Sequence, residues 1–138
     1  YERKDFSRMD LGDYLDRLAQ LLPRMKSAEA ALQNDAREHK AGRLSESQLV
    51  DSMEQRHIPA YRAIHRELTE LGHMPHLPAW ADIRELHGIV LEVMTLEVGK
   101  HRGTVDIPQS NDRLKVLSGR MASVGARLRA KNAPAAKS

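Results

Sequence analysis

Glu29 and His57 are two polar residues that interrupt apolar series at helical spacing. Glu29 lies 13 residues before Gly42 and His57 lies 15 residues after it. In a helical hairpin that turns at Gly42, with a rise of about 1.5 Å per residue, the two side chains fall at nearly the same level. A buried carboxylate beside an imidazole favours the charged ring and fixes its orientation. The alternative is a polar layer that sets the register of the packed helices.

Met121 is expected at the same level from the last helix, together with Val90 from the third. A methionine and a histidine that face each other inside a four-helix bundle resemble the axial haem ligands of b-type cytochromes. The resemblance ends there, because the Met here lies on the last helix and the His on the second. Methionine at such a position is more often core filler. Glu29, His57 and Met121 are our candidate ligand-binding residues, with core filling as the alternative role of Met121. No cofactor is predicted.

His39, Glu97 and His101 form a second candidate set, near the end of the bundle that holds the Gly42 turn. Glu97 and His101 are four residues apart and share one face of a helix, while His39 ends the inner face of the first helix. Two imidazoles and a carboxylate could bind zinc or another divalent metal, with water as the fourth ligand. The alternative is that these residues contact solvent at helix ends, where His also interacts favourably with the helix dipole.

The sequence carries no catalytic motif, and we predict that the protein is not an enzyme. Gly-x-Ser-x-Gly, a phosphate-binding glycine loop and His-Glu-x-x-His are all missing from it. The chain has no cysteine, which excludes disulfides, thiolate metal sites and a cysteine nucleophile. Arg113, Arg120 and Arg127 recur every seven residues without an aromatic residue for base stacking. We expect these arginines to form interhelical ion pairs rather than to bind nucleic acid.

Four helices are predicted to position these residues. Of the 138 residues, 41% are hydrophobic but only five are aromatic, so the core must consist mainly of aliphatic side chains. Apolar residues recur at helical spacing over residues 10–41, 45–71, 78–102 and 110–130. Gly42, Gly72 and Gly103 follow the first three helices, as helix-ending glycines do. Ser45 and Gln48 form a capping box at the start of the second helix.

The inner faces of the helices follow from the same spacing. The predicted inner residues of the first helix are Leu11, Leu15, Leu18, Leu22, Met25, Glu29, Leu32, Ala36 and His39. The inner residues of the second helix are Leu49, Met53, His57, Ala60, Ile64, Leu68 and Leu71, and those of the fourth are Leu114, Leu117, Met121, Val124 and Leu128. The third helix is apolar over more than half of its circumference and should be the most buried.

Four amphipathic helices with short connections predict an all-α fold, an antiparallel up-down-up-down four-helix bundle. It should form a single domain over residues 1–131, followed by a disordered tail over residues 132–138. Pro23 and Pro59 fall inside predicted helices at similar distances from the turn, and proline removes a helical hydrogen bond. We therefore predict that the first two helices kink at these prolines, and that Ser110 caps the fourth helix after a break at Pro108.

No segment has the roughly 20 consecutive apolar residues that a membrane helix needs. The chain begins at Tyr1, and its first residues lack the apolar stretch of a signal peptide. A mature exported protein, or a domain beyond an upstream anchor, would begin in this way, and so would a trimmed cytosolic domain. We expect a periplasmic or secreted location in preference to a cytoplasmic one.

The sequence predicts a non-enzymatic helical bundle that works as an interaction or sensory module, with a protein partner or a second copy of the chain. The alternative is a bundle that binds a metal or a small ligand through buried His and Glu residues. A binding site should leave a cavity beside those residues, whereas a structural polar layer should be closed and fully hydrogen-bonded.

Overall fold

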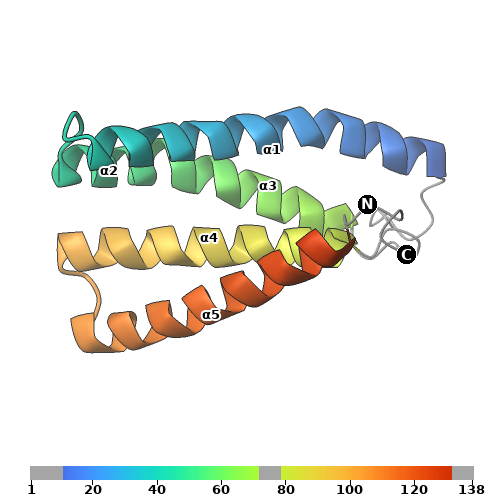
Figure 1. Ribbon diagram of the computed structural model, residues 1–138. Helices are drawn as coiled ribbons and strands as arrows, with labels where there is room; N and C mark the ends of the chain where they lie inside the picture. The colour runs from blue at the N-terminus through green and yellow to red at the C-terminus, as the bar shows by residue number, and fades with distance from the viewer. Residues whose placement is uncertain (1–10, 72–78, 132–138) are drawn as a thin grey trace, which may run out of the picture. The chain divides into compact units, whose positions relative to one another are not determined.

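The computed structural model describes residues 11–71 and 79–131, and over these residues its regular structure is entirely helical (Figure 1). The predicted all-α class is confirmed, and the described residues supply the four helical arms that a four-helix bundle requires. The chain divides into two compact units, residues 1–72 and 73–138, and the described part of each unit is a helical hairpin. The predicted tail, residues 132–138, lies outside the described residues, and the antiparallel order of all four arms stays a prediction.

The first hairpin consists of α1 (Leu11–Lys40), α2 (Glu46–Ser52), the π-helical turn η2 (Met53–His57) and α3 (Ile58–Leu71). The turn after α1 uses Gly42 with φ +81°, a left-handed conformation that favours glycine. The predicted capping box is present, because the Ser45 side chain accepts from the Gln48 N–H and the Gln48 side chain accepts from the Ser45 N–H. Both helix boundaries at the turn therefore follow from local sequence.

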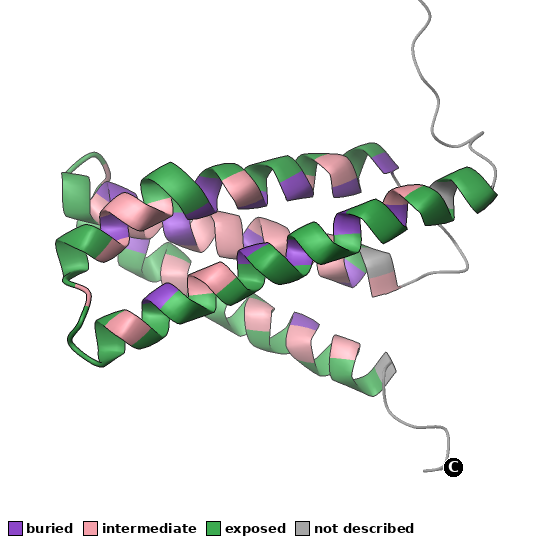
Figure 2. Cartoon of the chain, turned by 90° about the horizontal axis from the view of Figure 1, so that it is seen from above, coloured by how far each residue is buried: buried purple, intermediate pink, exposed green. Residues whose placement is uncertain are grey.

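The buried face of α1 matches the predicted one at Leu18 and Met25, but at the turns between and after them the buried residue comes one position earlier than predicted. Its buried residues are Leu18, Leu21, Met25, Ala28 and Asp35. Figure 2 shows how buried and exposed positions alternate along the helices. Leu22 is 44% exposed, and Glu29 and Ala36, seven and fourteen residues later, are exposed as well. Leu21 and Leu22 are equally apolar, so the spacing could not decide between the two series. Packing against α3 selects the series that contains Ala28, whose side chain is smaller than that of Glu29 in the other series.

A π turn precedes the proline of the second arm. The Ile58 N–H bonds to the carbonyl of Met53, five residues earlier, instead of four. Pro59 has no N–H, and in a regular α-helix its ring collides with the carbonyl four residues before it. The wider π turn that ends at His57 accommodates this defect. Pro23 lies within α1 on its exposed side, and the kinks that we predicted at the two prolines stay predictions.

The second hairpin consists of α4 (Ala79–Arg102) and α5 (Ile107–Lys131), joined by a turn at Gly103, whose φ is +76°. Its core is formed by Ile89, Leu117 and Val124, against which pack Leu86, Val93, Leu96, Met121 and Leu128. Three arginines of α5 pair with acidic residues of α4: Arg113 with Glu92, Arg120 with Glu85, and Arg127 with both Asp82 and Glu85. The predicted interhelical ion pairs are thus confirmed.

The start of α5 corrects the predicted cap at Ser110. The helix begins at Ile107, and the Asp106 side chain accepts from the Gln109 N–H at 2.8 Å. Pro108 lies inside the first turn, where its missing N–H would have had no helical partner. The predicted break at Pro108 is therefore wrong, because the first turn of a helix tolerates proline. Across the two hairpins, no described helix combines the length and the apolar character needed to cross a membrane.

Candidate functional site

The candidate site is centred on His57, which is 2% exposed and faces α1 from the end of the π turn. Its Nε2 lies 2.6 Å from Asp35 Oδ2, on the buried face of α1, and 3.3 Å from Ser52 Oγ. Ser52 also donates to Asp35 Oδ2 at 2.5 Å. Ser52 and His57, on the second arm of the first hairpin, therefore both contact one carboxylate oxygen of Asp35 on α1. These contacts link the two arms.

The partner of His57 is Asp35 and not Glu29, which corrects the predicted pairing. Glu29 is exposed and accepts a hydrogen bond from Gln33 at 3.1 Å. Glu29 belongs to the exposed series of α1, with Leu22 and Ala36. Asp35 belongs to the buried series, with Leu21 and Ala28. Both series have steps of seven residues, so the sequence alone does not select Asp35.

The pKa of the Asp35 carboxyl reflects opposing influences. Burial alone would raise this pKa, but the hydrogen bond from Ser52 and the hydrogen bond and charge of His57 hold it below its ordinary value. The guanidinium of Arg56, whose Nη1 is 3.9 Å from Asp35 Oδ2, acts in the same direction. The carboxylate is thus kept in its charged form.

Serine, histidine and aspartate together invite comparison with a nucleophilic triad, but the geometry is different. A triad places the carboxylate on one imidazole nitrogen and the serine on the other, so that the ring relays a proton between them. Here Asp35 and Ser52 both meet Nε2 of His57, and Ser52 donates to the carboxylate itself. The arrangement fixes the ring and the carboxylate, and it does not activate the serine.

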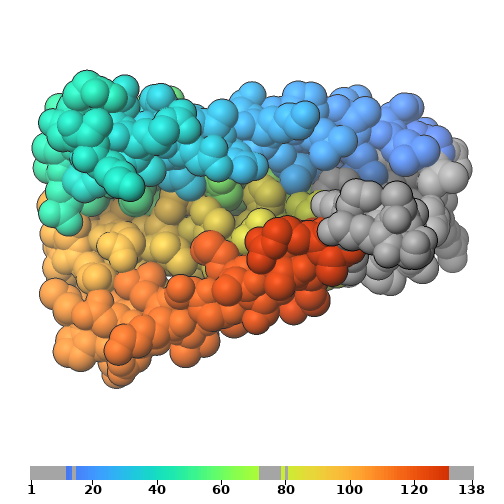
Figure 3. Space-filling view, in the orientation of Figure 1, coloured from blue at the N-terminus to red at the C-terminus, as the bar shows by residue number. Residues whose placement is uncertain are grey.

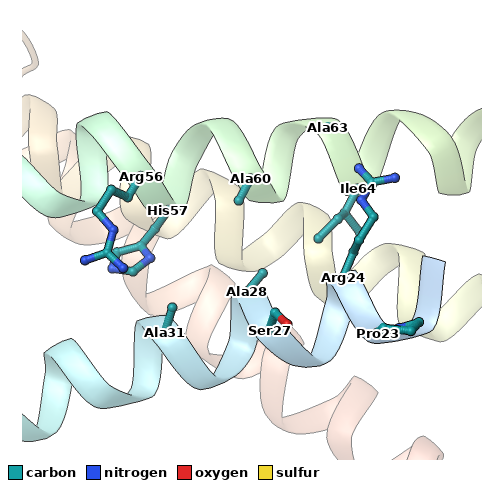
Figure 4. A pocket seen from close by; sticks show the side chains of 10 residues that line it. All are labelled: Pro23, Arg24, Ser27, Ala28, Ala31, Arg56, His57, Ala60, Ala63 and Ile64. Atoms are coloured by element: carbon teal, nitrogen blue, oxygen red, sulfur yellow. The ribbon is translucent and has the colours of Figure 1, made fainter. Parts of the chain in front are cut away.

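A groove of about 450 Å³ lies beside His57, and we call it the α1–α3 groove (Figure 4). Its ten lining residues come from the two arms of the first hairpin: Pro23, Arg24, Ser27, Ala28, Ala31, Arg56, His57, Ala60, Ala63 and Ile64. Ala28, His57 and Ile64 are buried and form its floor. Four of the ten are alanines, and these small side chains leave the space between the arms.

The two charged side chains that line the α1–α3 groove are both basic. Among the ten lining residues, Arg24 and Arg56 carry guanidinium groups and none is acidic. Arg24 bonds to Glu67 of α3, and Arg56 lies 3.9 Å from Asp35 of α1. These two pairs also show that the arms run in opposite directions, because an early residue of α1 meets a late residue of α3.

Met121, the third residue of the predicted ligand-binding set, belongs to the second hairpin. It is half-buried and packs against the core formed by Ile89, Leu117 and Val124. This placement agrees with the core-filling alternative, and its approach to His57 stays a prediction.

The predicted metal-binding residues make other contacts. His39 is exposed, and its Nδ1 lies 2.9 Å from the carbonyl of Leu44. Glu97 pairs with Lys100 at 3.8 Å, and His101 is exposed at the end of α4. Within residues 11–71 and 79–131, no group of three or more His, Asp or Glu side chains is arranged to hold a metal ion. The described residues therefore lend no support to the metal set.

Comparison with known proteins identifies no relative of the chain. No protein-family model matches the chain, and no curated protein and no solved structure is significantly similar to it.

Proposed function

We propose that the protein is a non-enzymatic sensory module that binds a small organic anion in the α1–α3 groove. One observation carries this proposal: the hollow beside the buried His57 contains two guanidinium groups and no carboxylate among its ten lining residues. A binding site is predicted to leave a cavity beside the buried polar residues, and a structural polar layer is predicted to be closed and fully hydrogen-bonded. The cavity supports binding, while the buried side-chain N and O atoms of the described residues all have hydrogen-bond partners.

The size and lining of the groove support this proposal. Its volume of about 450 Å³ falls within the range of ordinary small-molecule pockets, about 300 to 1,000 Å³. Such pockets combine an apolar wall with a few fixed polar groups, and here alanine methyl groups supply the wall. His57 is fixed by Asp35 and Ser52, so a ligand meets a rigid ring rather than one that it has to order.

A non-enzymatic role is supported by the Ser52–His57–Asp35 arrangement, in which Ser52 and Asp35 meet the same imidazole nitrogen and Ser52 donates to the carboxylate. An interaction role is supported by α1, whose outer surface is seen in Figure 3. Leu15 and Leu22 lie seven residues apart on this helix and are 47% and 44% exposed. Large apolar side chains on one exposed helix face suit contact with a protein partner.

Thermal melts of the full chain test the binding proposal. The chain is melted with octanoate, benzoate, citrate and sebacate, and with octylamine as a cationic control, all at one ionic strength. Because a ligand that binds only the folded state stabilises it, at least one organic anion should raise Tm and the amine should not.

Two alanine variants make this test specific to the groove. Ala63→Leu places a larger side chain in the groove from an exposed position, so it should remove the rise in Tm. Ala30→Leu changes an exposed alanine of α1 outside the groove and should keep it. The proposal fails if none of the anions raises Tm in the unmodified chain, or if Ala63→Leu responds as Ala30→Leu does.

A further inference from the structure

The two guanidinium groups of the α1–α3 groove lie at opposite ends of it. Arg24 bonds to Glu67, and Arg56 lies 3.9 Å from Asp35, so each arginine marks one level of the hairpin. The two levels are eleven residues apart on either arm, which corresponds to about 16 Å along the helices. Figure 4 shows the same arrangement, with Arg24 beside Ile64 at one end and Arg56 beside His57 at the other.

The stretch between the two arginines is apolar. Ala28 and Ala31 of α1 and Ala60 and Ala63 of α3 line it, and Ser27 is the polar side chain among them. A methylene chain laid along these methyl groups loses contact with water, and Ser27 is the one polar side chain that it would meet between the two arginines. A compact polyanion would engage one end and leave this apolar stretch uncovered.

From this pattern we infer that the ligand is a linear α,ω-dicarboxylate, with one carboxylate at Arg24, one at Arg56 and an apolar chain between them. This inference rests on the proposed function and names the chemical class of its ligand. The existing ion pairs do not block such binding. A guanidinium presents five N–H donors, so Arg24 can retain Glu67 while it binds a second carboxylate.

Calorimetric titration of the full chain with sebacate tests this inference. Decanoate has the same chain length with one carboxylate, and the matching diol has none. Sebacate should bind about tenfold more tightly than decanoate, the low end of the effect of a charge-assisted hydrogen bond to an exposed side chain. Over the series succinate, adipate, suberate and sebacate, affinity should rise about two- to fourfold for each added methylene.

Single arginine variants locate the two carboxylates. Arg24→Gln and Arg56→Gln should each lower the affinity for sebacate about tenfold, to the level of decanoate with the unmodified chain. Arg17→Gln is a matched control, because Arg17 Nη2 lies 3.8 Å from the same Glu67 but Arg17 does not line the groove. Arg62→Gln is the corresponding control on α3. Neither control should change the affinity.

Three outcomes have distinct meanings. An affinity for sebacate that falls about tenfold in both groove variants and is unchanged in both controls supports the inference. Equal affinity for sebacate and decanoate, or binding that ignores chain length, overturns it while binding of an organic anion stands. If octanoate, benzoate, citrate, decanoate and the dicarboxylates all fail to bind, the inference and the proposed function fall together.

Discussion

Replacement of Asp35 by alanine should destabilise the protein more than any other single carboxylate deletion on α1. The Asp35 carboxylate accepts from Ser52 at 2.5 Å and meets His57 Nε2 at 2.6 Å. Alanine removes both interactions and leaves the His57 ring, which is 2% exposed, with only the distant Ser52 hydroxyl at 3.3 Å. A buried polar group without a good partner is costly because it has given up its hydrogen bonds to water.

The expected loss follows from these contacts. A hydrogen bond to a charged group contributes about 1.5 to 3 kcal/mol, and an unsatisfied buried donor costs about 1 to 3 kcal/mol. The two energy contributions describe partly the same lost interaction and do not simply add. We therefore expect Asp35→Ala to lower the free energy of unfolding by about 3 kcal/mol. Asparagine keeps an acceptor in the same place, and Asp35→Asn should cost about 1 kcal/mol. Asp16→Ala, at an exposed position of the same helix, should stay within about 0.5 kcal/mol of the unmodified protein.

Urea unfolding at pH 7, followed by circular dichroism, measures all three variants. The reasoning is refuted if Asp35→Ala costs less than about 1 kcal/mol, the lower bound for an unsatisfied buried group. It is also refuted if alanine and asparagine are equally destabilising, since the remaining acceptor would then have no effect.

The low pKa of Asp35 adds a dependence on pH. Because this pKa is lower in the folded state than in the unfolded chain, the interaction stabilises the protein above the pKa of the unfolded carboxyl, about 4. The stabilisation is lost as the pH falls through the folded-state pKa. The difference in unfolding free energy between the unmodified protein and Asp35→Asn should therefore be largest near pH 7 and shrink below about pH 4. A difference that stays constant down to pH 3 would contradict this account.

Four further predictions concern backbone and burial. Gly99→Ala would bring its Cβ to 2.7 Å from Val105 Cγ1 and should cost about 1 kcal/mol in urea unfolding, whereas Gly119→Ala, with nothing within 4 Å, should stabilise by about 0.5 kcal/mol. Ser45→Ala loses the capping box and should cost about 1 kcal/mol in the same assay. Burial raises the pKa of the Tyr61 phenol, so its contribution to stability should be lost as the pH rises above 10. An absorbance titration compared with Tyr61→Phe checks this, and a phenol that ionises at or below pH 10 would contradict it.

The helices could be predicted because their ends are marked locally. The helix-ending glycines Gly42 and Gly103 and the capping box at Ser45 act within one turn of the chain, so the sequence alone identifies them. The buried face of α1 could not be fixed in this way. Leu21 and Leu22 satisfy the same spacing, and only packing against the second arm distinguishes them.

The candidate site was predicted in part. A histidine at the centre of an apolar stripe had to be buried and needed a polar partner, and His57 is buried as predicted. Its partner was missed because the spacing allows both the series with Glu29 and the series with Asp35, and only packing against the second arm distinguishes them. The α1–α3 groove was also missed, since it depends on alanines of two arms meeting across the hairpin. Alanine spacing within one helix carries no signal of that contact.

Pro59 links the irregular backbone to the site. In an α-helix, residues five apart differ by about 140° around the axis, so Ser52 and His57 would lie on different faces. The π turn bonds residues five apart, which brings Ser52 Oγ to 3.3 Å from His57 Nε2. Since the proline cannot sustain a regular turn before it, the wider turn costs less here than elsewhere in the helix. The residue that weakens the helix therefore permits the geometry in which Ser52 and His57 share one carboxylate of α1.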